Sequence, residues 1–395
     1  METMNKYLSK LCEISKKPER LVVGMMSGTA LDGLDVALCK IKGHGKDSNI
    51  EVLEFDTCEY SEEQRTRLRL IQSKELTNTQ ELTMLNSELG FWYAEKVLKL
   101  ITRWGIETSE VDLIASHGQT VYHAPAESED NIHTTLQMVD GDHIAQRSGI
   151  ITVSDFRQKH TAVGGEGAPM AGIFDELFFR DDTQNRMLLN LGGIANFSWL
   201  PSRNSGANIL ATDTGPANTL INEAMQTYFH MPYDEGGKVA ATGNIHSELV
   251  KYVLLEPYFR KSFPKTTGQE DFQLSYIEQL MEGHRIELEP ADLVATLTAI
   301  TSQSIARAVD ELVGDQSFDC YVSGGGSYNQ TLMNDLNDRI SQAKFKPFKE
   351  LGMHPDAKEA AMMAFFGNEL VAGEGFPIPG VTEEKVHLGK ISLPG

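Results

Sequence analysis

The chain has little cysteine and no long apolar run. Its 395 residues include four cysteines, scattered without a Cys-x-x-Cys pair: Cys12, Cys39, Cys58 and Cys320. A disulfide framework or a zinc site is therefore not expected, and reduced thiols in a cytoplasmic protein fit better. No apolar run approaches the about 20 residues of a membrane-spanning helix, and the charged N-terminus lacks the apolar segment of a signal peptide. We expect a cytoplasmic protein without a membrane partner.

Basic residues are also in short supply. The chain carries 35 Lys and Arg against 56 Asp and Glu, a formal net charge of −21. This balance argues against a nucleic-acid partner or an anionic membrane surface, because both reward clustered basic side chains. A nucleotide remains possible as a ligand, since backbone amides and Mg²⁺ can neutralise phosphates locally.

Several common catalytic motifs are missing. The chain has neither the Gly-Lys-Ser/Thr of a P-loop nor the Gly-x-Gly-x-x-Gly of a dinucleotide fold. It also lacks the Gly-x-Ser-x-Gly of a nucleophile elbow and the His-Glu-x-x-His of a zinc enzyme. Hydrolases built on a nucleophilic serine or on zinc are therefore disfavoured.

What the sequence does contain is an alternation of strand-like runs and amphipathic helical patterns, which is typical of an α/β protein. Residues 21–41 and 187–201 both have the pattern of strand, glycine turn and strand. Their spacing of about 165 residues suggests two similarly built domains, although common β-hairpins can also match by chance. We expect residues 1–154 with about 378–395 to form the N-terminal domain, and residues 155–377 to form the C-terminal domain.

The turn in the first of these stretches has the composition of a phosphate-binding loop. Ser27 and Thr29 can donate hydrogen bonds to phosphate oxygens, and the glycines allow close approach of the backbone. Asp32 or Asp35 can hold hydrated Mg²⁺. An ordinary β-hairpin explains the same residues equally well, because Asp-Gly is a frequent turn former.

Two further glycine-containing junctions follow. Residues 213–218, Asp-Thr-Gly-Pro-Ala-Asn, can meet a metal-bound phosphate at a helix N-terminus and can also serve as a helix cap with proline in the first turn. Residues 323–329, Ser-Gly-Gly-Gly-Ser-Tyr-Asn, contain three successive glycines that are costly to order. Either a flat adenosine lying against the backbone or close helix–strand packing explains them.

Three polar residues stand out beside apolar runs. Asp155 follows a β-branched run and is expected at the C-terminal edge of a strand, where open α/β sheets place their sites. There it can act as a general base or pair with Arg157. His117 suits either a sugar hydroxyl or a structural role, and Glu359 opens a helix whose dipole favours a carboxylate.

Together, ordered blocks of this sequence resemble the anhydro-N-acetylmuramic acid kinase family. The blocks run from Gly24 to about Leu388: GMMSGTALDGLDV, SHGQT, GDHIAQRSGI, DFR, GGEGAP, NLGGIAN, DTGPAN, KTTG, SGGGSYN, PDAKEA and the terminal LGKI. Each block alone is weakly specific. The ordered set, over nearly the whole chain, is highly specific.

The resemblance implies an α/β fold with two actin/ribonuclease H-like domains flanking an ATP cleft, with ATP and Mg²⁺ as cofactors and usually a homodimer. It also implies a kinase that opens the 1,6-anhydro bridge of anhydro-N-acetylmuramic acid while phosphorylating O6, for cell-wall recycling. Asp155 matches the family's base, which would deprotonate the water that attacks C1. Glu359 matches the family's active-site glutamate, near the metal and the anhydro bridge.

The site residues expected from the motifs and the resemblance fall into four sets. The catalytic set is Asp155 and Glu359. The ATP-binding set is Ser27, Gly28, Thr29, Ala30, Leu31, Asp32, Gly33, Leu34, Gly192, Gly193, Asp213, Gly215, Gly324, Gly325 and Gly326. The sugar-binding set is His117, Gln137, Gly165 and Glu166. The expected metal ligands are Asp213 and Glu359.

Three residues depart from the family's usual pattern. Ala30 stands where Ser is usual, Glu166 replaces a usual Gln, and Gly172 stands where Pro is common. Glu166 adds negative charge near an anionic substrate, so a kinase for levoglucosan, the uncharged 1,6-anhydroglucose, is the alternative. An ATP-driven chaperone or filament module of the same superfamily is a remote second alternative.

Overall fold

The computed structural model describes residues 5–29, 31–124, 126, 132–168, 170–378 and 381–395. These residues divide into two compact units. Unit 1 comprises Met1–Leu177 and Asp356–Gly395, and unit 2 comprises Phe178–Pro355. No helix in the described ranges has both the length and the apolar character needed to cross a membrane.

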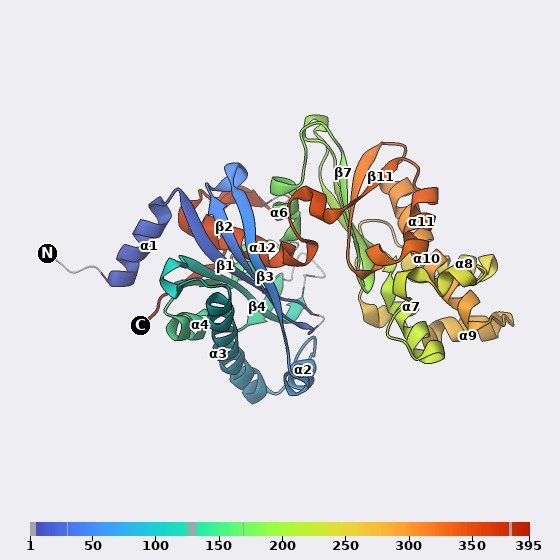
Figure 1. Cartoon of the computed structure of the whole chain (residues 1–395), viewed down its shortest axis with the longest axis horizontal. Helices are drawn as coiled ribbons and strands as arrows, with labels where there is room; N and C mark the ends of the chain where they lie inside the picture. The colour runs from blue at the N-terminus through green and yellow to red at the C-terminus, as the bar shows by residue number, and fades with distance from the viewer. Residues whose placement is uncertain (1–4, 30, 125, 127–131, 169, 379–380) are drawn as a thin grey trace. The chain divides into compact units, whose positions relative to one another are not determined.

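Unit 1 is built on a sheet in the order β14-β6-β4-β1-β2-β3, with β5 paired to β4 (Figure 1). Its strands are β1 (Glu19–Ser27), β2 (Gly33–Lys42), β3 (Asn49–Glu59), β4 (Leu113–Ala124), β5 (Thr134–Met138), β6 (Thr152–Ser154) and β14 (Lys390–Ser392). Its helices are α1 (Lys6–Lys16), α2 (Glu62–Arg69), α3 (Thr79–Arg103), α4 (Gly141–Ser148), α5 (Phe156–Ala162), α6 (Ala171–Phe178) and α12 (Lys358–Ala372). The small pair β12 (Phe376–Ile378) and β13 (Thr382–Val386) follows α12. The central strand β1 is an apolar run buried along most of its length, as expected for a strand covered on both faces.

Unit 2 has a five-stranded sheet in the order β11-β10-β7-β8-β9 (Figure 1). Its strands are β7 (Arg186–Leu191), β8 (Ile194–Leu200), β9 (Leu210–Pro216), β10 (Phe318–Ser323) and β11 (Ala343–Pro347). Its helices are α7 (Asn218–Ala224), α8 (Ser247–Leu254), α9 (Leu274–His284), α10 (Pro290–Leu312) and α11 (Gln330–Arg339). The apolar side chains of the sheet pack on α10 and α11, and a second apolar cluster joins α7, α8, α9 and α10.

The two sheets share one topology. In each, three consecutive strands pair antiparallel, a later strand pairs in parallel with the first of them, and a further strand pairs in parallel with that later one. The orders β3-β2-β1-β4-β6 and β9-β8-β7-β10-β11 correspond strand for strand. The repeat predicted at residues 21–41 and 187–201 is thus confirmed as the hairpins β1–β2 and β7–β8. The α/β class with two ribonuclease H-like units is confirmed as well.

The units do not end where the sequence suggested, because α12 packs on the first sheet. A Cβ at Gly24 of β1 would lie 1.8 Å from the carbonyl oxygen of Ala360, and one at Gly367 would lie 2.7 Å from the Cβ of Ala115 in β4. Only glycine permits such close contact between helix and sheet backbones. The second segment of unit 1 therefore begins at residue 356 rather than at about 378.

The first boundary also differs, since α5 stays with unit 1. The ring of Phe156, at the start of α5, lies 6.1 Å from the ring of Phe366 in α12. Unit 2 begins only after residue 177. The side chain at position 155, expected in the C-terminal domain, belongs to unit 1 together with position 359.

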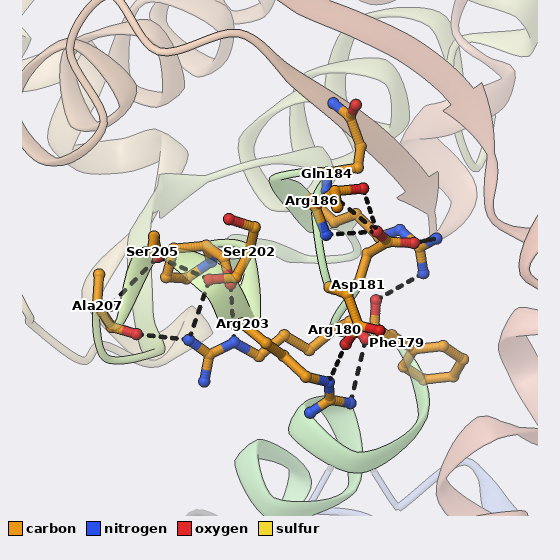
Figure 2. Close-up of polar contacts among 12 residues, drawn as sticks. Phe179, Arg180, Asp181, Gln184, Arg186, Ser202, Arg203, Ser205 and Ala207 are labelled. Carbon is orange, nitrogen blue, oxygen red and sulfur yellow. Dashed lines mark hydrogen bonds and ion pairs between the residues drawn. The ribbon is translucent and has the colours of Figure 1, made fainter.

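Polar contacts hold the first segment of unit 2 in place (Figure 2). Asp181 accepts hydrogen bonds from the backbone N–H groups of Thr183 and Gln184 at 2.9 and 3.0 Å, and it pairs with Arg186 at 2.6 Å. Arg180 donates to the carbonyl oxygens of Pro201 and Ala207 at 2.7 and 2.6 Å. These contacts tie the segment before β7 to the loop after β8.

Candidate functional site

The turn between β1 and β2 is braced from inside by a buried polar cluster. The Ser27 hydroxyl is 1% exposed. It lies 2.8 Å from the carbonyl oxygen of Gly33, 2.7 Å from Oε1 of Gln119 and 2.9 Å from the Tyr60 hydroxyl. Gln119 in turn donates to the carbonyl oxygen of Gly28 at 3.1 Å. In this structure the Ser27 side chain supports the turn from beneath, and its contact with phosphate stays a prediction.

The rest of this turn divides into packed and accessible residues. Leu31 adopts a left-handed backbone with φ 58° and is buried, and Leu34 lies in the core. A Cβ on Gly33 would lie 2.6 Å from the carbonyl oxygen of Cys58. Thr29 and Asp32 are exposed, and Gly28 is half-buried. Ala30 lies outside the described residues. Among the described residues of the turn, 28, 29 and 32 are the ones accessible to a ligand.

Asp155 occupies the predicted position at the end of a strand. It lies between β6 and α5, with a left-handed backbone of φ 55° and ψ 50° that is unusual for a residue with a side chain. Its carboxylate makes no capping hydrogen bond to α5. It pairs instead with Lys390 of β14, not with Arg157 as the alternative interpretation had it. Backbone strain of this kind costs about 1–3 kcal/mol and concentrates at functional sites.

Glu359 lies in the first turn of α12, and its side chain is exposed. Desolvation by the surrounding protein nevertheless raises its pKa, which Lys358 and Arg157 oppose and Asp32 reinforces. Burial likewise raises the pKa of Asp35 to about 6; a hydrogen bond from Thr57 opposes this rise, and Asp32 and Glu359 add to it. These carboxylates of unit 1 therefore lie within electrostatic range of one another.

The described part of the chain holds no preformed group of three or more His, Cys, Asp or Glu side chains arranged for a metal ion. Mg²⁺ commonly takes one or two carboxylates together with waters and substrate phosphates, so it needs no such cage. The carboxylate oxygens of Glu359 and of nearby Asp32 are of the ligand type that Mg²⁺ prefers. The expected ligands Asp213 and Glu359 stay predictions.

His117 lies beneath the site rather than in it. It is 2% exposed, and both ring nitrogens have partners. Nε2 accepts from Nε of Arg157 at 2.8 Å, and Nδ1 lies 3.1 Å from the carbonyl oxygen of Gly118. These contacts fit the structural role that the sequence left open for His117, and its binding of a sugar hydroxyl stays a prediction. His117 orients Arg157, a residue that we considered only as an ion-pair partner although it completes the Asp-Phe-Arg block.

The loop around Gly165 is fixed to α5. A Cβ on Gly165 would lie 2.2 Å from Nδ1 of His160, which explains the need for glycine. That same nitrogen accepts from the backbone N–H of Gly167 at 3.0 Å, and Arg157 donates to the carbonyl oxygen of Gly167 at 3.1 Å. Gly165 is buried, whereas Glu166 is exposed. The loop therefore presents Glu166 outward on a held backbone.

Only the nitrogen of the Gln137 side-chain amide, on β5, has a hydrogen-bond partner among the described residues. Its Nε2 donates to Oγ1 of Thr135 at 2.8 Å. Its Oε1 is buried and finds no donor among the described residues. An acceptor of this kind fits a hydroxyl donor such as a sugar, because an unpaired buried polar atom is costly.

In unit 2, the turn between β7 and β8 is held by α7. Asn218 donates from Nδ2 to the carbonyl oxygens of Leu191 and Gly192, both at 2.8 Å. The Thr219 hydroxyl donates to the carbonyl oxygen of Gly193 at 2.9 Å. The two predicted glycines of this turn are therefore fixed by the first residues of the helix that follows β9.

A pocket of about 380 Å³ opens beside this helix. Its lining comes from α7, from the loop after it and from the glycine-rich junction: Asn218, Ile221, Asn222, Tyr233, Asp234, Glu235, Gly236, Gly325, Tyr328 and Asn329. Two of these residues, Tyr233 and Tyr328, are aromatic and remain 55% and 80% exposed. A pocket with accessible aromatic faces suits a flat heterocycle.

The three successive glycines serve two purposes. Cβ atoms on Gly324 and Gly326 would lie 2.6 and 2.7 Å from atoms of Leu191, so both allow close packing. A Cβ on Gly325 would have its nearest neighbour at 3.8 Å, and this residue lines the pocket. Close packing therefore explains Gly324 and Gly326, whereas the adenosine interpretation stays a prediction for Gly325.

Asp213 and Gly215 of β9 are placed by neighbouring loops. The Asp213 carboxylate accepts from the backbone N–H of Thr267 at 2.9 Å, and burial raises its pKa against that hydrogen bond. A Cβ on Gly215 would lie 2.8 Å from the ring of Phe259. Gly215 therefore has a packing role in this structure.

Comparison with known proteins gives concordant results. The family described as "Anhydro-N-acetylmuramic acid kinase" matches residues 20–393. An anhydro-N-acetylmuramic acid kinase of Pseudoalteromonas atlantica is 39% identical over 99% of this chain and 100% of its own. One from Caldanaerobacter subterraneus is 37% identical over 98% and 100%. Among solved structures, the activator of 2-hydroxyisocaproyl-CoA dehydratase from Clostridium difficile, with bound ADPNP, has 11% identity and a TM-score of 0.40 over 89% of this chain and 95% of its own. From the match over residues 20–393 and the full-length relatives, the chain belongs to the anhydro-N-acetylmuramic acid kinase family.

Proposed function

We propose that this protein is an ATP-dependent kinase that opens 1,6-anhydro-N-acetylmuramic acid with water and phosphorylates O6, giving N-acetylmuramic acid 6-phosphate for cell-wall recycling. The observation that carries the proposal is the family match from residue 20 to 393, which includes Asp155 at the end of β6. A strained carboxylate at a strand end, two residues before Arg157, supports the sugar site in unit 1, and Glu359 lies within electrostatic range of that arginine.

In the proposed reaction, Asp155 accepts a proton from a water molecule as the water oxygen attacks C1 of the sugar. The bond between C1 and the bridging oxygen breaks, and that oxygen remains on C6 with the electron pair. It then attacks the γ-phosphorus of ATP, and ADP leaves. Attack by water on the face opposite the leaving oxygen corresponds to an inverting glycosidase.

The other site residues assist this chemistry by position and charge. Glu359 lies near the anhydro bridge, and the unpaired Oε1 of Gln137 accepts from a sugar hydroxyl. The backbone of Gly28 and Thr29, and that of Gly192 and Gly193, would contact the phosphates. Mg²⁺, held by carboxylates such as Glu359 and Asp213, would neutralise phosphate charge.

We place the adenosine of ATP in the pocket of unit 2. The open face of Gly325 and the exposed rings of Tyr233 and Tyr328 support this assignment. A purine would lie against these surfaces by stacking, which tolerates no bulky side chain at position 325.

The test is incubation with ATP, Mg²⁺ and the anhydro-sugar in water enriched in ¹⁸O. We expect ADP release together with a 6-phosphate sugar that carries ¹⁸O at C1 and none in the phosphate, as read by mass spectrometry. Absence of ADP above background would rule the proposal out. Levoglucosan is the parallel substrate, and markedly faster turnover of it would keep the mechanism and change the substrate.

We further propose that the enzyme is a cytoplasmic homodimer. The four free cysteines and the absence of a Cys-x-x-Cys pair support a reducing compartment. Light scattering of the purified protein measures the dimer, and a mass near 43.7 kDa, that of one chain, would contradict it.

A further inference from the structure

Arg157 of α5 is held in one orientation by two hydrogen bonds. Its Nε donates to Nε2 of His117 at 2.8 Å, and its Nη1 donates to the carbonyl oxygen of Gly167 at 3.1 Å. One anchor is on β4 and the other is in the loop that presents Glu166. The guanidinium plane is therefore set by two separate parts of unit 1.

His117 can act only as an acceptor toward Arg157. Burial and the neighbouring guanidinium lower the pKa of His117 to about 3, so the ring is neutral at physiological pH. Its Nδ1 faces the carbonyl oxygen of Gly118, which requires a proton on that nitrogen. Nε2 is then a lone-pair acceptor, which suits an arginine N–H.

These two bonds use two of the five N–H donors of an arginine. Within the described ranges no carboxylate lies in ion-pair distance of Arg157, although Glu359 acts on it electrostatically. Asp155, two residues earlier, has Lys390 as its partner. Arg157 thus brings a fixed positive charge and unused donors to a region that also holds Glu359 and Glu166.

We propose that Arg157 binds the carboxylate of the sugar's lactyl group and thereby selects an acidic anhydro-sugar over a neutral one. This inference rests on the proposed function. The planar fork of arginine matches a carboxylate in two parallel hydrogen bonds. The charge of Arg157 also offsets that of Glu166, the residue whose charge would otherwise disfavour an anionic substrate.

The carboxylate is favoured over a phosphate of ATP because of where Arg157 is anchored. Its two partners belong to β4, which pairs with β6 just before Asp155, the proposed base, and to the Gly165 loop, which is tied to α5 directly after that base. A ligand group bound to Arg157 would therefore belong to the sugar rather than to ATP. If Arg157 bound phosphate instead, its loss would impair the reaction whatever sugar was supplied.

The experiment compares two sugars that differ only in the acidic group: 1,6-anhydro-N-acetylmuramic acid and 1,6-anhydro-N-acetylglucosamine, which lacks the lactyl ether. For Arg157→Gln we expect kcat/KM for the acidic sugar to fall about 10- to 100-fold, the range for one charge-assisted hydrogen-bonded contact. For the neutral sugar we expect a change of less than about threefold. Arg157→Lys should restore only part of the loss, because lysine keeps the charge without the fork.

Arg147→Gln provides the matched control, because Arg147 is 57% exposed on α4 and pairs with Glu95. It should leave both sugars unchanged. Where the neutral sugar is turned over too slowly, dissociation constants of the two sugars from calorimetry give the same comparison. The thermal unfolding midpoint of each variant shows whether it is folded.

Equal loss with both sugars, or no loss with either, would overturn the role of Arg157. Failure of wild-type enzyme to release ADP with any anhydro-sugar would instead overturn the proposed function, so the two failures are distinct.

Discussion

The two units have the same strand order but present different chemistry. Unit 1 offers charged side chains near the end of β6 and the start of α12, among them Asp155, Arg157 and Glu359. Unit 2 offers backbone and aromatic surface around Gly325 and Tyr328. One topology therefore carries charged side chains at a strand end in one copy and a pocket in the other, so the role that we propose for each unit depends on the side chains placed on the fold.

The two glycine hairpins differ in the same way. The turn of β1–β2 is supported by side chains of its own sheet, through Ser27, Gln119 and Tyr60. The turn of β7–β8 is supported by the start of a helix, through Asn218 and Thr219. The first hairpin is thus coupled to the core of unit 1, and the second is coupled to the helix that lines the pocket.

The largest effect is expected from Asp155→Asn, which tests whether unit 1 carries the chemistry. The amide cannot accept the proton from water, so kcat should fall about 10²- to 10⁴-fold. ATP binding should stay within about twofold by calorimetry, because Asp155 is proposed to contact the water and the sugar and not the nucleotide. A near-normal rate of ADP release would remove Asp155 as the base. Lost ATP affinity would contradict the assignment of Asp155 to the sugar rather than to the nucleotide.

Features of the two units that depend on neighbouring residues could be predicted from the sequence, whereas features that depend on contacts between distant residues could not. The sequence predicts that Asp155 lies at the end of a strand, because a β-branched run ending in aspartate is a local signal. The repeated hairpin is predicted from a local pattern as well. The extent of unit 1 is not, because it depends on Gly24 meeting Ala360 across more than three hundred residues. No local pattern records such a contact.

The next effect separates two adjacent glycines of unit 2. Gly324 has φ 81°, and its Cβ would lie 2.6 Å from the backbone of Leu191, so Gly324→Ala should lower the free energy of unfolding by about 2–4 kcal/mol. Gly325→Ala, with 3.8 Å of space, should change stability by about 0.5 kcal/mol or less. It should weaken ATP binding instead. Urea unfolding and calorimetry measure the two quantities, and equal effects of both substitutions would contradict the assignment of Gly325 to the pocket.

A smaller effect is expected from Asn218→Ala, which removes the support of the second hairpin. Losing two hydrogen bonds should raise the dissociation constant for ATP by up to about 30-fold, since each contributes about 1 kcal/mol. Ser27→Ala is the counterpart in unit 1, where the loss should appear in stability. If Asn218→Ala leaves nucleotide affinity unchanged, the coupling of hairpin and pocket is wrong.

Residue types alone did not reveal which polar side chains face a ligand. His117 and Ser27 were predicted to contact substrates because their side chains are suited to it, yet both are buried with internal partners. Arg157 was undervalued because its partners are on β4 and in the Gly165 loop. The direction of a side chain depends on tertiary contacts, which spacing along the chain does not encode.

The smallest effect concerns a half-buried carboxylate of unit 1. The pKa of Asp35 is raised from 3.8 to about 6, chiefly by burial. A raised carboxyl pKa means that the folded state favours the protonated form, so this contribution to stability is present below about pH 4 and is lost as pH rises through about 6. Asp35→Asn should therefore be more stable than wild type by about 1 kcal/mol at pH 7, with the difference vanishing near pH 4. Urea unfolding from pH 4 to 8 measures this. A difference independent of pH would mean that the asparagine changes packing or the hydrogen bond from Thr57, and that repulsion among the carboxylates of unit 1 contributes nothing.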